Sequence, residues 1–358
     1  MTAQHTGWDA AGFRADIEQV LQDFVATQAT WIDALGPDAR TLVEHARTSV
    51  SGGKRFRASF CWWGHQSVSE SAPDDPALLR ACASLELLHA SALVHDDYMD
   101  ASDVRRGRPA THRAFEQLHR ENRWSASPEQ YGASAAILLG DLLLSWSDEL
   151  LRTCGLPADR VLDALGYFDR TRSEVVTGQF LDVSAQARGS ADVDTAMTVL
   201  RYKSAKYSIE RPLHIGAALG GASPAVIEQL TRFGLPLGEA FQLRDDLLGV
   251  FGDPSVTGKP AGDDLVEGKR TVLVSLALDA LPAPDAHLLD SSLGTPLDEK
   301  RVATLRDLID SSGARAQVED VITALTERSL KALAAADITP RARAVLEGLA
   351  ADATQRAV

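Results

Sequence analysis

The chain has 358 residues, of which 45% are hydrophobic and 24% charged, as in an ordinary soluble globular protein. Its formal net charge of −14 argues against nucleic acid or an anionic membrane surface as the main partner, although local cations could still bind phosphate groups. No secretory signal is visible at the start, and no run reaches the roughly 18 uninterrupted apolar residues that membrane insertion requires. The three cysteines, Cys61, Cys82 and Cys154, lack metal-binding spacing and favour reduced thiols in a cytoplasmic protein.

Nearly every segment repeats its apolar residues with the period of a helix, and the alternation typical of strands is scarce. We therefore expect a short N-terminal tail at 1–12 and one all-α domain, a helical bundle, at 13–358. Helices are predicted at about 13–34, 38–50, 54–68, 76–101, 108–121, 131–153, 158–182, 192–202, 205–219, 224–251, 268–280, 298–312, 314–335 and 340–355. Gly- and Pro-rich stretches predict loops between them, among them 71–75, 121–130, 186–191, 221–224 and 282–296.

A glycine pair followed by basic residues, GGKRFR at 52–57, opens the third predicted helix. Lys54 and Arg57 are three residues apart and therefore share a helix face. The N–H groups and the dipole of a helix start also favour an anion. Taken alone, such a cluster is more often a solvated basic surface.

A long apolar helix is predicted to end in the run HASALVHDDYMD at 89–100, the most informative stretch of the chain. Asp96 and Asp100 are four residues apart, so their side chains point the same way. His89 and Ala92 lie on the same face of this helix as Asp96 and Asp100. The carboxylates therefore extend the face that is predicted to point into the protein. Like charges at that place need a counter-cation, which favours a metal site over a solvated acidic helix end.

A second acidic helix is predicted far downstream, where FQLRDDLLG occupies 241–249. Gln242 and Asp246 share a helix face, and Asp245 lies next to them. Two acidic helices facing each other across a bundle would form an all-oxygen site, which suits Mg²⁺ better than zinc or copper. A helical di-iron site would instead need Glu-x-x-His pairs, and neither acidic helix has one.

Three further segments carry cations that suit phosphate groups. They are RRGR at 105–108, KSAK at 203–206, and the Gly- and Pro-rich stretch 252–264 with Lys259, which is typical of a covering loop. Taken alone, each basic cluster is more often a solvated surface than a site, and the stretch 252–264 is equally compatible with a plain surface connection. Together with the two acidic helices, they favour a site for diphosphate groups.

In their order along the chain, these motifs resemble the trans-polyprenyl diphosphate synthase family, which includes geranylgeranyl, farnesyl and longer-chain diphosphate synthases. The resemblance rests on GGKRFR, LLHASALVHDDYMD, RRGRP, KSAKY, FQLRDDLLGVFGD and GKPAGDDLVEGK, over roughly residues 50–272. It implies an isoprenoid-synthase-type bundle around a deep central cavity, usually as a homodimer. It also implies a prenyltransferase that condenses isopentenyl diphosphate with an allylic diphosphate and uses Mg²⁺, with three ions expected.

The resemblance implies roles for individual residues as well. The expected metal ligands are Asp96, Asp100 and Asp245, assisted by Asp97 and Asp246. The expected isopentenyl diphosphate pocket consists of Lys54, Arg57, His89 and Arg106. The allylic diphosphate is expected to contact Arg105, Lys203, Gln242 and Lys259, while Lys269 helps to close the site. Ser204 stands where the family usually has Thr, so Lys203, Ser204 and Gln242 are the expected catalytic groups that face the developing carbocation.

The chain departs from the family pattern at two places. Gly249 stands where most of the family has the third Asp of the second motif, so we expect metal binding to persist in weaker form. The C-terminus carries only Arg356 in place of a basic closing tail, which puts that contribution in doubt.

Product length is expected to depend on the helix turns that precede Asp96. Ser91 and Ala92 lie about 7 Å before it at 1.5 Å per residue, and both are small. Leu88 and then Leu85 could form the next floor of the cavity. We therefore expect geranylgeranyl diphosphate (C20), with farnesyl diphosphate (C15) or a longer product as alternatives.

Two other functions fit parts of the pattern. A class I terpene cyclase shares the fold and the first aspartate motif, but it has no need for a second diphosphate pocket at Lys54, Arg57 and Arg106. A non-catalytic subunit that tunes a homologue typically loses aspartates of the first motif, and this chain keeps all three.

Overall fold

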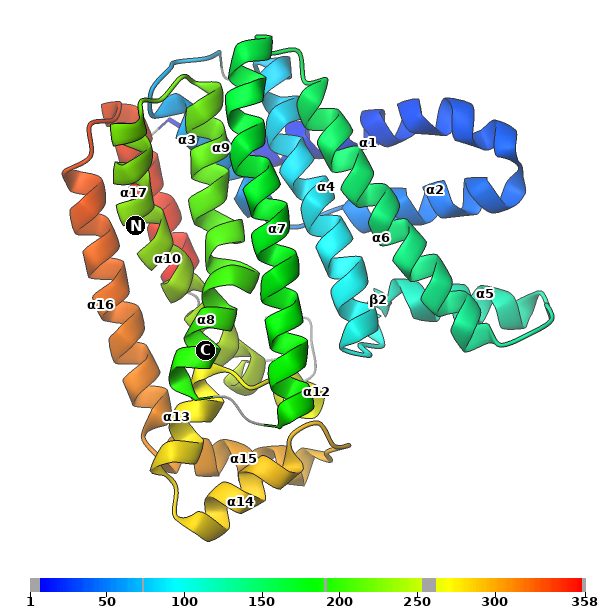
Figure 1. The fold of residues 1–358 in the computed structure, drawn as a ribbon, viewed down its shortest axis with the longest axis vertical. Helices are drawn as coiled ribbons and strands as arrows, with labels where there is room; N and C mark the ends of the chain where they lie inside the picture. The colour runs from blue at the N-terminus through cyan, green and yellow to red at the C-terminus, as the bar shows by residue number, and fades with distance from the viewer. Residues whose placement is uncertain (1–6, 73, 190–191, 253–261, 356–358) are drawn as a thin grey trace. The chain divides into compact units, whose positions relative to one another are not determined.

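The computed structural model describes residues 7–72, 74–189, 192–252 and 262–355. These residues form two compact units, which we call the N-terminal unit (7–165 and 216–221) and the C-terminal unit (166–215 and 222–355). Apart from one short hairpin, the secondary structure in the described ranges is helical (Figure 1), which confirms the all-α prediction. That residues 13–358 form one domain stays a prediction.

Long helices built on buried apolar stripes dominate the N-terminal unit. Its elements are α1 (Ala10–Ile32), the 3₁₀ turn η1 (Asp33–Leu35), α2 (Pro37–Val50), α3 (Phe56–Gln66), α4 (Pro76–Met99), β1 (Val104–Arg105), β2 (Arg108–Pro109), α5 (Thr111–Glu121), α6 (Pro128–Arg152) and the start of α7 (Ala158–Arg188). Helix α4 packs along α6, and the two run side by side in Figure 1. The Asp75 side chain accepts hydrogen bonds from the N–H groups of Ala77 and Leu78, so α4 begins with a side-chain cap followed by proline at its first position.

Helix α4 is the apolar centre of this unit. Its length and mean hydropathy of 1.4 would suffice for a membrane span, but 72% of the apolar window is buried inside the protein. That burial is typical of the core helix of a soluble protein, and the carboxylates at its end are held by this core. The cysteines Cys61, Cys82 and Cys154 are free and buried, as predicted.

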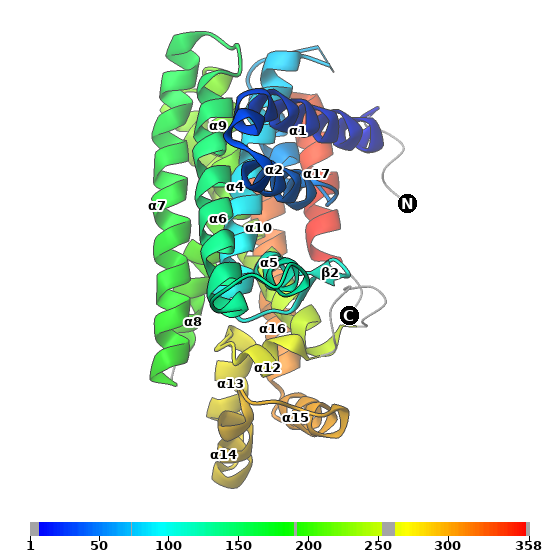
Figure 2. The ribbon, with the colours of Figure 1, turned by 90° about the vertical axis from the view of Figure 1, so that its right-hand side faces the viewer.

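The C-terminal unit is built around α10. It contains the rest of α7, α8 (Val193–Leu200), the π-helix η2 (Arg201–Glu210), the first five residues of α9 (Arg211–Leu219), α10 (Pro224–Phe251), α12 (Asp263–Glu267), α13 (Val272–Ala280), α14 (Ala283–Ser292), α15 (Glu299–Ser311), α16 (Ala314–Ala334) and α17 (Pro340–Thr354). Helix α10 contacts η2, α16 and α17, while α14 and α15 lie beyond α13 at the lower end of Figure 2. The second acidic motif thus lies on the helix that packs against η2, α16 and α17.

Several predicted boundaries were wrong. The stretch 282–296 is not all loop, because Pro282 and Pro284 fall at the start of α14, where a helix tolerates proline. The helix predicted from 108 begins at 111, since 104–109 form the hairpin β1–β2. The expected break at 203–204 is absent, because η2 joins α8 to α9 without interruption. The helix predicted to end at 182 continues to Arg188 as α7.

Candidate active site

The first aspartate motif lies at the C-terminal end of α4. The helix ends at Met99, and Asp100 is its C-terminal cap residue, whose N–H donates to the carbonyl of Asp96 at 2.8 Å. Asp96 and Asp100 therefore remain one helical turn apart, as predicted from their spacing. The helix therefore ends two residues before the predicted boundary at 101.

Asp97 is neutralised by an arginine from the hairpin that follows. The Arg105 Nε donates to both carboxylate oxygens of Asp97, at 2.8 and 3.1 Å, and its Nη2 also donates to this carboxylate. Only 3% of Asp97 is exposed, whereas Asp96 is half-buried with its Oδ2 3.8 Å from Arg105 Nη2. Asp97 therefore orients Arg105, and Asp96 and Asp100 are the carboxylates better placed for a cation.

The hairpin also returns Arg106 to the GGKR turn. Arg106 and Gly107, at its tip, have φ of 51° and 72°, the pair of left-handed residues that a type I′ turn requires. The Arg106 Nη1 donates to the carbonyl of Ser51 at 2.7 Å. A Cβ on Gly53 would lie 3.0 Å from Arg106 Nη2, so a residue without a side chain lets the guanidinium lie against this turn.

His89 lies within a cluster of arginines. Burial, followed by the charges of Arg57, Arg106, Arg105 and Arg55, holds the pKa of His89 well below its usual range. Burial and the neighbouring Arg55 and Arg105 likewise lower the pKa of Arg106. His89 is therefore neutral, and the predicted group of Arg57, His89 and Arg106 does come together, with Lys54 in the adjoining turn. A gathering of cations around a neutral donor suits an anionic ligand.

Two glutamates that the sequence analysis missed hold this turn in place. Arg55 has a left-handed backbone, with φ of 52°, and its buried guanidinium donates to Glu86 at 3.3 Å, to Glu18 and to the carbonyl of Val50. Glu86 also accepts from the backbone N–H of Ala58 at 3.1 Å. The available signal was a glutamate within the apolar run LLRACASLELL, since a buried acid needs a partner.

In the C-terminal unit, two of the three predicted catalytic groups, Ser204 and Gln242, form a chain of hydrogen bonds with Asp246. The Ser204 Oγ donates to Gln242 Oε1, and Gln242 Nε2 donates to Asp246 Oδ1 at 2.7 Å. Ser204 and Lys203 lie in the π-helix η2, a rare conformation that is frequent at functional sites. The Lys203 Nζ is 2.6 Å from Asp182 Oδ2, an acidic partner that the sequence analysis did not identify.

Glycines on both neighbouring helices allow the wide π-helix to fit. A Cβ on Gly178 of α7 would lie 2.3 Å from the backbone nitrogen of Lys203. A Cβ on Gly238 of α10 would lie 2.4 Å from the carbonyl oxygen of Ala205. Both distances are far below van der Waals contact, so the position of η2 depends on these two glycines.

The carboxyl groups of the second motif are crowded. Asp246 is 7% exposed, and its pKa is raised to about 8 by burial first and then by the charges of Asp264 and Asp245. The Lys269 Nζ pairs with Asp264 Oδ1 at 3.2 Å and with Glu267. Burial together with repulsion between like charges favours an added cation at this end of α10.

The donor set suits Mg²⁺. Its side chains are all carboxylates, although no three Asp, Glu, His or Cys side chains among the described residues form a ready metal-binding group. Mg²⁺ is usually held by one or two carboxylates together with water and substrate phosphates, so Asp96 with Asp100, and Asp245 in its own unit, fit this ion.

The remaining predicted residues lie as follows. Ser91 and Leu88 are 3% and 2% exposed, and Ala92 is half-buried. Lys259, predicted to contact the allylic diphosphate, lies outside the described residues, as does Arg356.

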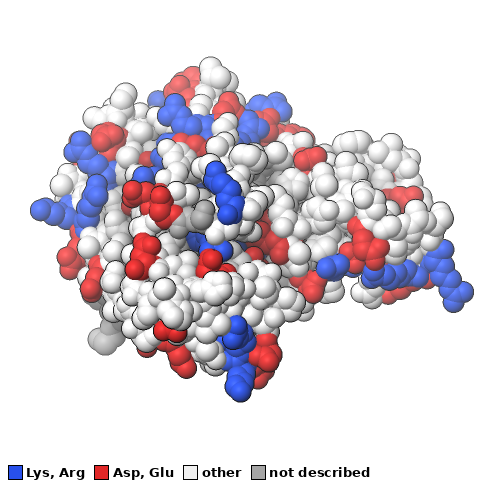
Figure 3. All heavy atoms as spheres, turned by 60° about the horizontal axis from the view of Figure 1, so that its bottom comes forward, with Lys and Arg blue, Asp and Glu red and all other residues white. Residues whose placement is uncertain are grey.

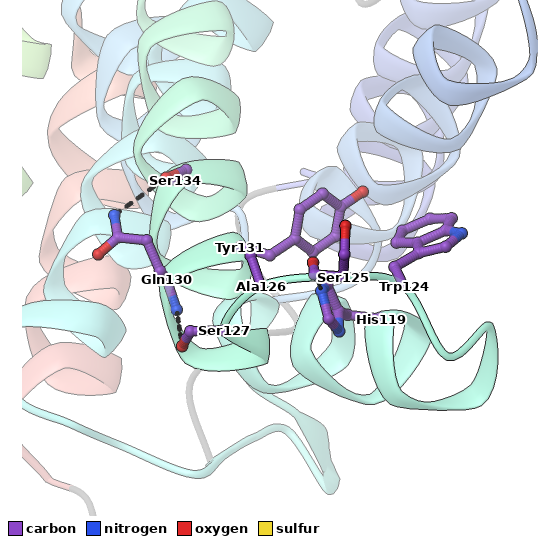
Figure 4. Close-up of a pocket in the computed structure, with 8 residues that line it drawn as sticks. All are labelled: His119, Trp124, Ser125, Ala126, Ser127, Gln130, Tyr131 and Ser134. Atoms are coloured by element: carbon purple, nitrogen blue, oxygen red, sulfur yellow. Dashed lines mark hydrogen bonds between the residues drawn. The ribbon is translucent and has the colours of Figure 1, made fainter.

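A pocket of about 510 Å³ lies elsewhere in the N-terminal unit, between the end of α5 and the start of α6 (Figure 4). The rings of His119, Trp124 and Tyr131 contact one another at its wall, with centroids 5.2 to 5.9 Å apart. None of the predicted site residues lines this pocket, so it is not the candidate active site.

Charges of both signs are mixed on the surface. On the face drawn in Figure 3, lysine and arginine side chains alternate with aspartate and glutamate. A net charge of −14 therefore leaves room for local cationic sites such as the one around His89.

Comparison with known proteins decides the family. The family model for polyprenyl synthetase matches residues 39–309. The chain belongs to this family. It is a prenyltransferase, and the predicted resemblance is confirmed.

Individual relatives agree with this assignment. A crystal structure of geranylgeranyl pyrophosphate synthase from Corynebacterium glutamicum, complexed with isoprenyl diphosphate and magnesium, has 39% sequence identity and a TM-score of 0.94, over 98% of this chain and 100% of that one. Geranylfarnesyl diphosphate synthase of Natronomonas pharaonis is 31% identical over 84% of this chain and 85% of its own. Geranylgeranyl diphosphate synthase of Methanosarcina mazei is 34% identical, and the match covers 69% of this chain and 71% of that protein. The names of these relatives differ in the length of the product.

Proposed function

We propose that this prenyltransferase condenses isopentenyl diphosphate with an allylic diphosphate and that its main product is trans-geranylgeranyl diphosphate (C20). The proposal is carried by one observation: the arginine cluster around neutral His89 lies in the same unit as Asp96, with Arg105 between the two groups. The cationic side chains could bind one diphosphate directly, and the carboxylates could bind a second diphosphate through metal ions.

Isopentenyl diphosphate is assigned to Lys54, Arg57, His89 and Arg106. Arginine matches phosphate oxygens with two parallel donors, and a neutral imidazole donates a hydrogen bond without adding charge. The hydrogen bonds of Arg55 go to Glu86, Glu18 and the carbonyl of Val50, so we assign Arg55 to the support of the turn and Arg57 to the ligand.

The allylic diphosphate is assigned to Arg105, Lys203, Gln242, Lys259 and Lys269. Bound Mg²⁺, for which we propose three ions held by Asp96, Asp100 and Asp245, would neutralise the charge that grows on the departing diphosphate. The Lys203 Nζ would exchange Asp182 for a phosphate oxygen. The magnesium and isoprenyl diphosphate in the Corynebacterium glutamicum structure support the same ligands here.

Breaking the allylic C–O bond leaves a carbocation. The Ser204 hydroxyl, the Gln242 amide oxygen and the carbonyl of Lys203 would direct partial negative charge toward it. The double bond of isopentenyl diphosphate then attacks the cation, and the proton that is lost passes to the departed diphosphate. An apolar cavity that excludes water would protect the cation, as the family resemblance implies.

The C20 product follows from the small side chains Ser91 and Ala92, one to two turns before Asp96 on α4. Aromatic residues there would obstruct a growing chain, whereas Leu88 lies a further turn away. Farnesyl or longer products are the alternatives. A terpene cyclase is less favoured because it would not need the arginine cluster around His89.

We further propose that the protein is a cytoplasmic homodimer. On α7, Val176, Phe180 and Val183 are 62%, 68% and 37% exposed and share one helix face, which suits contact with a second copy. Phe180→Glu should convert the dimer into a monomer in light scattering, and Val321→Glu on α16, also exposed, is the control.

One assay tests the activity: purified protein, Mg²⁺, labelled isopentenyl diphosphate and either dimethylallyl, geranyl or farnesyl diphosphate, with the products separated by length. We expect C20 as the main product. Turnover of a single allylic diphosphate without isopentenyl diphosphate would favour the cyclase, and no consumption with any primer would favour the non-catalytic subunit.

A further inference from the structure

The face that α7 turns toward the π-helix η2 carries a glutamate, Glu174, that the proposed reaction does not use. Glu174, Gly178 and Asp182 recur every four residues and therefore share one side of α7. Asp182 pairs with the Nζ of Lys203, and a Cβ on Gly178 would lie 2.3 Å from the backbone nitrogen of Lys203. Glu174 is thus the remaining member of a row that contacts η2 along its length.

Glu174 lies beside two cations at the end of η2. Its carboxylate accepts from Nε and Nη2 of Arg211 at 2.7 and 2.6 Å, and Lys206 Nζ lies 4.0 Å from its Oε1. The Lys206 Nζ also lies 2.7 Å from Oε2 of Glu210. Glu210 and Arg211 are buried, so two acids and two cations balance one another inside the protein. Lys206, a cation of the KSAK motif, therefore has acidic partners within the fold.

The backbone bond that closes the last π turn joins these same two cationic residues. The N–H of Arg211 donates to the carbonyl of Lys206, five residues before it. In an α-helix, residues five apart lie about 140° apart around the axis at 3.6 residues per turn, whereas the i→i+5 bond of a π-helix closes a turn between them. The π form therefore brings Lys206 and Arg211 to one face, where a single carboxylate meets both.

Arg211 is also tied to α10 through a histidine. Its Nη1 lies 3.1 Å from Nδ1 of His214, whose Nε2 lies 2.9 Å from the hydroxyl of Thr231 on α10. Burial by itself lowers the pKa of Arg211, but its hydrogen bond to Glu174 and the charge of Glu210 raise it above the usual value. The end of η2 is thus fixed between α7 and α10 by groups that match in charge.

We propose that Glu174 is a positioning residue, which holds the last turn of η2 in the π conformation through Lys206 and Arg211. Conversion of that turn to an α turn would shift the register by one residue and rotate Lys203 and Ser204 by about 100° around the axis. The inference rests on the proposed function, in which Lys203 and Ser204 face the allylic substrate.

The experiment compares Glu174→Gln with Glu319→Gln in the full-length protein. Glu319 makes an equivalent contact of two hydrogen bonds with Arg244, both at 2.6 Å, and Arg244 projects from α10 on the side opposite Gln242. Each variant is measured by steady-state kinetics with isopentenyl and farnesyl diphosphate, and by hydrogen exchange of peptides that contain Arg211.

We expect Glu174→Gln to lower kcat roughly tenfold and to speed the exchange by a similar factor, because it removes a hydrogen-bonded charge that holds the turn. The KM for isopentenyl diphosphate should stay unchanged, since that substrate is assigned to residues of the N-terminal unit. Glu319→Gln should leave kcat and exchange at Arg211 unchanged.

A second variant keeps the test decisive if Glu174→Gln does not fold. Lys206→Met/Glu210→Gln removes one acid and one cation but leaves both hydrogen bonds between Glu174 and Arg211. If Glu174 merely ties α7 to Arg211, this double variant should behave as the unaltered protein. A hold on the π turn instead predicts a loss of kcat of about threefold, with faster exchange.

Unchanged kcat or unchanged exchange in a folded Glu174→Gln protein would overturn the inference, as would an equal loss of kcat in Glu319→Gln. An unchanged double variant would overturn it as well. If the unaltered protein does not condense the two substrates, the proposed function fails. The exchange measurement needs no substrate and then still decides whether Glu174 holds the π turn.

Discussion

The hydroxyl of Ser204 in the π-helix η2 donates to the amide oxygen of Gln242 in α10, which fixes the orientation of the amide and lets its nitrogen donate to Asp246. The three side chains come from two helices held together by close glycine contacts. This relationship gives Ser204 a role that can be separated from substrate binding.

Ser204→Ala should lower kcat about fivefold, since one hydrogen bond that orients a catalytic group contributes about 1 kcal/mol. Ser204→Thr keeps the hydroxyl and should retain most of the activity. Steady-state kinetics with both substrates would measure this. A fall in kcat of the same size in the threonine variant would contradict the role of the hydroxyl.

Arg105→Gln should destabilise the protein by about 3 kcal/mol, because it leaves the buried carboxylate of Asp97 without its cation. Urea denaturation of the single variant and of Arg105→Gln/Asp97→Asn gives the test. The double variant should recover part of the loss, since it removes the uncompensated charge. Equal stability of the two variants would rule out the ion pair as the cause.

His214→Gln should make stability less dependent on pH. His214 is buried, accepts from Arg211 at 3.1 Å and faces Thr231 at 2.9 Å, and burial followed by the charge of Arg211 lowers its pKa to about 3. The unfolded chain, with a pKa of about 6.5, binds a proton that the folded chain excludes. Stability should therefore fall as pH drops below about 6.5 and continue to fall toward about 3.

The expected contribution of His214 to this slope is on the order of 1 kcal/mol per pH unit. Urea denaturation between neutral and mildly acid pH would measure the slope in both proteins. Other buried histidines give both proteins a common background, so the difference between slopes is the quantity to compare. Identical slopes would show that His214 does not carry the effect.

Ala92→Phe should shorten the main product from C20 to C15 by placing a ring one turn before Asp96. Ser91→Phe tests the same idea at a more buried position, where overpacking also threatens folding. Met99→Phe, exposed near the end of the same helix, is the control. Product lengths that stay the same in a folded Ala92→Phe protein would refute this assignment of the cavity floor.

Gly178→Ala should destabilise the protein by about 1–3 kcal/mol, because the added methyl group overlaps the backbone of η2 at Lys203. Gly166→Ala on the same helix adds a methyl group with nothing within 4 Å and should be neutral or slightly stabilising. Urea denaturation compares them directly. Similar effects from both changes would show that the close contact is unimportant.

The sequence by itself determined the helical class and the order of the motifs. It also determined the spacing of Asp96 and Asp100, because helix periodicity is a local property that adjacent residues carry. The tertiary structure decided which distant side chains meet: Arg105 with Asp97, Glu86 with Arg55, and Glu174 with Arg211. Such pairs depend on a hairpin tip, a buried turn and a π-helix that faces α7. No local pattern specifies these contacts, since they arise only when the core brings separate segments together.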